Sequence, residues 1–230
     1  FALAGAHLGD LAGVQHHAAD QLHVEVAHLQ RALAGLAHRG KRLRQQRLEV
    51  FARGHALAPF VCLGAQGVVV PHVESELEAK RIADHCRFPP LGHRSMGGGL
   101  QQLGFAALPV GEAARIVNEE TLVVVMLESP RGIENCEAIA AVPGIDALLI
   151  GTNDLCFEMG IPGKFDDPRV AEAYKKVIAA CRKHGKFVGM GGMYTKELLE
   201  RHIAMGVQLI LSGSDYSLLQ QAAKARAAWA

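Results

Sequence analysis

Two carboxylates follow two apolar runs of this chain, and their type and spacing suit the binding of a divalent cation. Glu128 directly follows the apolar run 122–127, and Asp154 lies shortly after the apolar run 147–150. In a parallel α/β barrel, the edge formed by the carboxyl ends of the strands carries the chemistry. Two carboxylates on neighbouring strand ends can share one hard divalent cation. The alternative is that each carboxylate caps a helix or structures its own loop.

The segment between the two runs is compatible with a helix. Apolar Ile133, Ala138 and Ile139 recur at roughly helical spacing, and Pro143-Gly144 ends the pattern. Residues 123–154 therefore predict one strand–helix–strand unit, in which both carboxylates lie at the same edge of a parallel sheet.

The same alternation continues from residue 64 to the C-terminus. Strands are expected at 67–71, 122–127, 147–150, 186–190 and 207–211, and helices at 74–87, 110–120, 168–185, 195–206 and 216–229. This rhythm predicts an α/β fold with a parallel sheet, namely a (β/α)8 TIM barrel. An open doubly wound sheet is the alternative, and the lack of a glycine-rich dinucleotide or phosphate-binding fingerprint disfavours it. Eight strands require three more from residues 1–63, where only 48–52 resembles a strand.

Residues 1–63 form an atypical N-terminal segment of what we expect to be one domain spanning 1–230. Residues 1–55 hold seven of the twelve histidines and no proline. The spacing His23-x-Glu25-x-x-His28 resembles a metal motif, but a solvated polar face is the preferred interpretation. Residues 39–47 carry five positive charges and no negative ones. A solvated helix face or a loop is preferred there to a nucleic-acid site.

Composition excludes several classes of function. The formal net charge of +1 gives no reason to expect nucleic acid or an anionic membrane as a partner. No apolar run approaches the roughly 18 residues that span a bilayer, and residues 1–11 lack the basic start of a signal peptide. The five cysteines are scattered without a CxxC pair. They predict reduced thiols in a cytoplasmic protein.

Six short pieces of the chain, in order, resemble a known family. They are G-A-Q-G-V-V-V-P-H-V (64–73), R-F-P-P-L-G-H-R (87–94), V-M-L-E-S (125–129), I-G-T-N-D-L (150–155), E-M-G-I-P-G (158–163) and S-G-S-D (212–215). Over about residues 64–230 the chain resembles the HpcH/HpaI-type class II pyruvate aldolases, typified by 4-hydroxy-2-oxoheptanedioate aldolase.

The resemblance implies a TIM barrel, assembled as a homo-oligomer that is usually a trimer or hexamer. The 26 residues that separate Glu128 from Asp154 match the family's two metal ligands, so the implied cofactor is a divalent ion, Mg²⁺, Mn²⁺ or Co²⁺. The implied reaction cleaves or forms 4-hydroxy-2-oxo acids from pyruvate, or a pyruvate analogue, and an aldehyde. The implied partners are thus a small keto acid and an aldehyde, with no nucleic acid and no membrane.

The N-terminal part departs from the family pattern. The family carries an acidic-His-Gly/Ala-Pro motif, whose histidine is the catalytic base, and an arginine that binds the keto acid. Residues 1–63 contain no Glu-His pair, and Arg53 is the only candidate arginine, with a downstream spacing several residues short. This segment has either diverged or is not the natural reading frame. The second functional hypothesis is therefore a catalytically inactive barrel that binds metal and keto acid.

Several further residues have candidate roles. Gly151, Thr152 and Asn153 can offer backbone N–H groups to a substrate carboxylate at a helix N-terminus, or can form a tight turn. His72 and Arg94 are each more consistent with a non-catalytic polar residue than with a site residue. Asp215 is expected to cap the closing helix, and no lysine lies within an apolar strand, which disfavours Schiff-base chemistry.

Overall fold

The computed structural model describes residues 48–50, 64–97 and 99–229. The His23–Glu25–His28 motif, the basic run 39–47 and Arg53 lie outside the described residues, so their predictions stay predictions.

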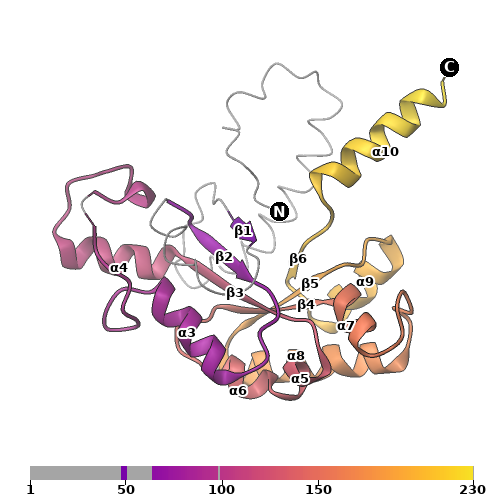
Figure 1. The fold of residues 1–230 in the computed structure, drawn as a ribbon, viewed down its shortest axis with the longest axis horizontal. Helices are drawn as coiled ribbons and strands as arrows, with labels where there is room; N and C mark the ends of the chain where they lie inside the picture. The colour runs from indigo at the N-terminus through magenta and orange to yellow at the C-terminus, as the bar shows by residue number, and fades with distance from the viewer. Residues whose placement is uncertain (1–47, 51–63, 98, 230) are drawn as a thin grey trace.

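The described strands form one parallel sheet whose spatial order equals the chain order (Figure 1). The strands are β1 (Leu48–Val50), β2 (Gly67–Val70), β3 (Leu122–Leu127), β4 (Ala147–Gly151), β5 (Phe187–Gly191) and β6 (Leu209–Ile210). Each crossover therefore advances by one strand, as in an α/β barrel. β1 pairs with β2 and lies within the segment 48–52, the one part of residues 1–63 that resembles a strand in sequence. Among the described strands, β1 and β6 are the two edges.

The helices also follow the expected alternation. They are α3 (Glu76–Cys86), α4 (Val110–Glu120), α5 (Pro130–Glu134), α6 (Cys136–Ala140), α7 (Thr152–Glu158), α8 (Pro168–His184), α9 (Lys196–Met205) and α10 (Asp215–Ala227), with a 3-10 helix at Gln101–Leu103. Ser75 begins α3 with a capping box, and Gly185 ends α8 in the left-handed conformation. Local sequence thus defines where α3 begins and where α8 ends.

Two local predictions need correction. The segment between β3 and β4 is two short helices that meet at Asn135, whose φ of −89° and ψ of 4° interrupt the helical path. The cap of α10 is Ser214, not Asp215: the Ser214 hydroxyl accepts the N–H of Ser217 at 3.2 Å. Asp215 is instead the first residue of α10 and accepts the N–H of Tyr216 at 2.7 Å. A serine one residue earlier competes for the cap position, because both types can accept that bond.

The sheet is apolar on both faces, as expected for parallel strands. α3, α6 and α8 cover one face (Figure 1), where alternate strand residues join them in the larger core. The intervening strand residues form a second buried cluster: Val69, Leu122, Val124, Ala147, Leu149 and Leu209. Successive side chains of a strand point to opposite faces of the sheet, so alternate residues face the helices. Because the strands are parallel, the residues that follow them lie at one common edge.

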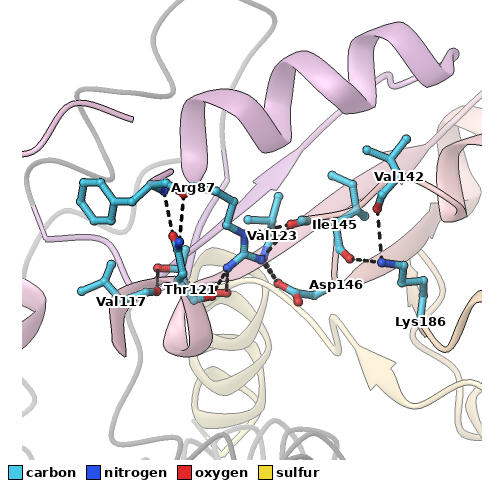
Figure 2. Close-up of polar contacts among 11 residues, drawn as sticks. Arg87, Val117, Thr121, Val123, Val142, Ile145, Asp146 and Lys186 are labelled. Atoms are coloured by element: carbon cyan, nitrogen blue, oxygen red, sulfur yellow. Dashed lines mark hydrogen bonds and ion pairs between the residues drawn. The ribbon is translucent and has the colours of Figure 1, made fainter. Parts of the chain in front are cut away.

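Arg87 ties together the amino ends of β3 and β4 (Figure 2). Its side chain is only 2% exposed and donates to the carbonyl oxygens of Thr121 at 2.9 Å and Gly144 at 2.8 Å, and to Asp146 Oδ2 at 2.5 Å. Asp146 also accepts the N–H of Val123 at 2.8 Å. A fully hydrogen-bonded buried ion pair at this end of a barrel contributes to the fold rather than to chemistry.

The C-terminal helix α10 extends away from the sheet (Figure 1), and none of its residues is buried. Tyr216, Leu219 and Trp229 are each at least 70% exposed. No helix within residues 64–97 and 99–229 combines the length and apolarity needed to cross a membrane.

Candidate metal and substrate site

The carboxyl ends of β3 and β4 bring Glu128 and Asp154 together. Leu127 of β3 pairs with Ile150 of β4, so the residues that follow both strands lie at the same edge. Glu128 is 4% exposed, whereas Asp154, in the first turn of α7, is exposed. Asp154 is near enough to Glu128 to influence the pKa of its carboxyl group.

The environment of Glu128 favours its neutral form when no cation is present. Burial is the largest influence and raises the pKa of its carboxyl group. The backbone N–H of His72 and the charge of its ring oppose that rise, while Asp154 adds to it. The net result is a raised pKa. A like charge nearby disfavours the ionised form of a carboxyl group, and a cation bound between the two groups would reverse that effect.

Gly151 leaves the space that the Glu128 side chain occupies. A Cβ atom at residue 151 would lie 2.6 Å from Glu128 Cγ and 2.7 Å from its Oε1. The φ of Gly151 is −83°, which any residue can adopt, so the requirement for glycine here is steric and not conformational. The missing Cβ lets the end of β4 approach the carboxylate of β3.

His72 contacts Glu128 through its backbone. Its N–H donates to Glu128 Oε2 at 2.8 Å, and its ring Nδ1 lies 3.5 Å from the same atom. The φ of His72 is +54°, in the left-handed region that is uncommon for residues other than glycine. Such a conformation costs on the order of 1–3 kcal/mol and persists only where its surroundings impose it.

The loop after β2 is fastened to the loop after β3, and this imposes the conformation of His72. The N–H of Val73 donates to the Met126 carbonyl at 3.0 Å. Glu74 accepts the Ser129 hydroxyl at 2.6 Å through its side chain and the Asn135 amide at 2.8 Å through its carbonyl. The residues of the β3 region in these bonds lie before and after Glu128 in the chain. The bonds therefore hold in place both the Glu128 carboxylate and the His72 N–H group that donates to it.

The first turn of α7 is held from two sides. The Thr152 hydroxyl lies 2.7 Å from the Tyr174 hydroxyl, and both residues are fully buried. On the other side Gly192, with a φ of +85°, lies so close that a Cβ atom there would be 2.9 Å from the Asn153 nitrogen. The segment 151–153 predicted to bind substrate is therefore the start of a helix, as expected, and its backbone is packed in place.

The residues present fit a hard divalent cation. The donors are two carboxylates, and no group of three or more His, Cys, Asp or Glu side chains placed for a metal occurs in the described part of the chain. Ions such as Mg²⁺ keep several water ligands and bind through one or two carboxylates plus substrate oxygens. The common position of the carboxylates at the carboxyl edge of the sheet and the space at Gly151 are the observations that support this fit.

Arg94, a candidate from the sequence, is not part of this site, whereas three residues that support the site are identified only by the structure. Arg94 is 4% exposed, with its guanidinium carbon 4.4 Å above the Phe88 ring, so it is a buried packing residue. The His72 N–H, Glu74 and Tyr174 are parts of the site that the sequence pattern does not predict. Pairing of two loops creates the first two contacts, and packing of α8 creates the third, so no local motif signals them.

Comparison with known proteins gives a consistent result. A family model described as HpcH/HpaI aldolase/citrate lyase matches residues 13–222. The 4-hydroxy-4-methyl-2-oxoglutarate aldolase cghB of Chaetomium globosum is 42% identical over 163 residues, 70% of this chain and 61% of that protein. The hydroxypyruvate/pyruvate aldolase of Delftia acidovorans is 37% identical over 164 residues, 71% of this chain and 60% of that protein. The chain thus spans about three-fifths of the length of these curated relatives.

Solved structures agree with the sequence relatives. The HpcH/HpaI aldolase of Desulfitobacterium hafniense has a TM-score of 0.73 at 26% identity, covering 85% of this chain and 75% of that chain. With the parallel order of the described strands, this likeness confirms the predicted TIM-barrel class. The predicted family resemblance is confirmed as well.

Proposed function

This chain belongs to the HpcH/HpaI aldolase/citrate lyase family, and from that membership we propose that it is a divalent-metal-dependent aldolase. The proposed reaction cleaves or forms 4-hydroxy-2-oxo acids, with pyruvate or a pyruvate analogue and an aldehyde as the smaller molecules. The relatives named above as aldolases support the reaction class. The observation that carries the proposal is the placement of Glu128 and Asp154 at the same carboxyl edge of the sheet, directly after β3 and in the first turn of α7.

We assign Glu128 and Asp154 as the residues that hold the cation, Mg²⁺, Mn²⁺ or Co²⁺. A cation bound there would supply the electrophile that stabilises the negative charge developing on a keto acid during aldol chemistry. The His72 N–H bond and the close packing at Gly151 keep the Glu128 carboxylate in one orientation. Preorganisation of this kind avoids rearranging the ligand each time substrate binds.

We propose that the backbone of residues 151–153 binds the substrate carboxylate. These residues begin α7, and the first N–H groups of a helix lack partners within the helix. They adjoin Asp154, so a keto acid held by this turn would lie next to the cation ligands. Arg53 is retained as the proposed catalytic arginine of the N-terminal segment, and a homo-oligomeric trimer or hexamer is the proposed assembly.

The lysines are consistent with a mechanism that does not use a Schiff base. No lysine lies on a strand of the described sheet. Lys186, directly before β5, is bound to the carbonyl oxygens of Val142 at 3.3 Å and Ile145 at 2.8 Å (Figure 2). It lies at the amino edge of the sheet, opposite Glu128. Borohydride treatment with pyruvate should therefore leave no lysine adduct in a mass spectrum.

Calorimetric titration with Mn²⁺ tests the assignment of ligands. The wild-type chain should bind one ion, and Glu128→Ala and Asp154→Ala should each abolish the binding heat. Glu134→Ala is the matched control, because this exposed carboxylate on α5 is not part of the site. Unchanged Mn²⁺ affinity in both site variants would refute the assignment of Glu128 and Asp154 as metal ligands, and with it the proposed metal-dependent mechanism.

A further inference from the structure

A buried series of contacts, two hydrogen bonds and one ring–ring contact, joins α7, α8 and α9 next to the first turn of α7. Thr152 at the start of α7 shares a 2.7 Å hydrogen bond with the Tyr174 hydroxyl of α8. The Tyr174 ring lies against the imidazole of His202 on α9, with centroids 4.3 Å apart and the planes tilted by 60°. His202 Nδ1 is 2.7 Å from the Leu198 carbonyl oxygen. The first three of these residues are at most 2% exposed, so the chain of contacts lies inside the core.

A hydroxyl at position 174 is not needed to fill space. Tyr174 belongs to the main apolar core, where phenylalanine would occupy nearly the same volume. A hydroxyl group transferred to such surroundings is unfavourable unless it is hydrogen-bonded. Burial raises the pKa of Tyr174, so the group stays protonated and can donate to Thr152. The specific consequence of the hydroxyl is therefore the bond to the start of α7.

The position of Thr152 connects this bond to the site. Gly151, on one side of Thr152, packs directly on the Glu128 side chain, and Asn153, on the other, packs on Gly192. Asp154 follows two residues after Thr152 in the same helical turn. A helix of seven residues has little stability of its own, so contacts of its first turn decide where that turn lies.

We propose that Tyr174 is a positioning residue, whose hydroxyl holds the first turn of α7 in the orientation that places Asp154 beside Glu128. Tyr174 acts through Thr152 and contacts neither cation nor substrate. The role in metal binding rests on the proposed function, whereas the ordering of α7 can be measured without metal.

The test combines Mn²⁺ calorimetry with amide hydrogen exchange of the metal-free protein. Tyr174→Phe should weaken Mn²⁺ binding about tenfold, the lower end of the range for residues that orient metal ligands. The amides of α7 (Thr152–Glu158) should exchange faster, while those of β4 keep the wild-type rate. Thr152→Val should have the same effects. The double variant should bind Mn²⁺ no more weakly than either single variant, because both substitutions remove one shared bond.

Ile178→Val is the matched control. Ile178 lies on α8, is 4% exposed and belongs to the same core, but it takes no part in this series of contacts. Its loss of one methylene should lower the melting temperature while leaving Mn²⁺ affinity and α7 exchange unchanged.

Calorimetry and hydrogen exchange together distinguish failure of the role proposed for Tyr174 from failure of the proposed function. Wild-type exchange in α7 of the Tyr174→Phe variant, or additive losses of affinity in the double variant, would overturn the role of Tyr174. A wild-type chain that binds no Mn²⁺ would refute the proposed function, and the exchange arm alone would then decide whether Tyr174 orders α7.

Discussion

Replacing Gly151 with alanine should displace the Glu128 carboxylate without straining the backbone. The new Cβ atom would lie 2.6 Å from Glu128 Cγ and 3.0 Å from its Cδ. Carbon atoms in packed interiors settle at about 3.5–4.0 Å, so the Glu128 side chain must retreat by roughly 1 Å. The φ of −83° at residue 151 suits alanine, so the effect is confined to this contact.

The size of that displacement sets the expected loss. Misplacing a reacting group by about 1 Å costs on the order of 100-fold in rate, which equals about 2.8 kcal/mol. Disturbing the orientation of a metal ligand costs about 10–100-fold in metal affinity. Overpacking a core site also lowers the free energy of unfolding by about 1–3 kcal/mol. Gly151→Ala should therefore reduce Mn²⁺ affinity about 10–100-fold and aldolase activity on the order of 100-fold in a protein that still folds.

Calorimetry with Mn²⁺ and urea unfolding should be run on Gly151→Ala beside Gly111→Ala. Gly111 lies exposed in α4, and a Cβ atom added there would have no neighbour within 4 Å, so its substitution should leave affinity unchanged. Helix propensity should make the control equally stable or more stable. Wild-type Mn²⁺ affinity in Gly151→Ala would refute the claim that the Glu128 carboxylate needs the space beside residue 151.

Buried charged and titratable groups give three further predictions. Folding raises the pKa of Glu128, so its contribution to the stability of the metal-free protein is present below the ordinary glutamate pKa and is lost as pH rises through the raised value. The free energy of unfolding in urea should therefore fall between about pH 4 and pH 8, and Glu128→Gln should reduce that fall. Burial lowers the pKa of His202 from 6.5, so the stability tied to its neutral form should fall as pH drops below 6.5; an equal fall in His202→Gln would contradict this. Arg87→Met should lower the free energy of unfolding by about 3–5 kcal/mol, because Asp146 loses its buried partner, and a loss below about 1 kcal/mol in denaturant titrations would contradict the role given to the pair.

Local chemistry makes much of the fold predictable. The apolar runs of β3 and β4, and the breaks after them, suffice to place Glu128 and Asp154 at one edge of the sheet. The ranges expected for the helices at 74–87 and 195–206 include Ser75 and Thr195, whose side chains accept the bonds that begin α3 and α9. Gly185, which the pattern predicts as the end of α8, does end it. Each of these signals depends on residues within a few positions of one another.

The remainder depends on contacts between distant parts of the chain. The left-handed conformation of His72 arises because Val73 and Glu74 bond to residues of the β3 region more than 50 positions later. The Tyr174 hydroxyl meets Thr152 from 22 positions away. Neither residue type is distinctive at its position, so sequence pattern alone could not identify these supports of the site.

Pyruvate release from a 4-hydroxy-2-oxo acid, followed during removal and return of metal, tests the central claim most directly. The protein treated with excess EDTA should be inactive on 4-hydroxy-4-methyl-2-oxoglutarate, and added Mn²⁺ or Mg²⁺ should restore pyruvate release. Asp154→Asn should stay inactive at the same metal concentration, because it lacks one of the two carboxylates. Full activity in excess EDTA would contradict the account, and Mn²⁺ binding at Glu128 and Asp154 without any pyruvate release would identify a barrel that binds metal but does not catalyse the reaction.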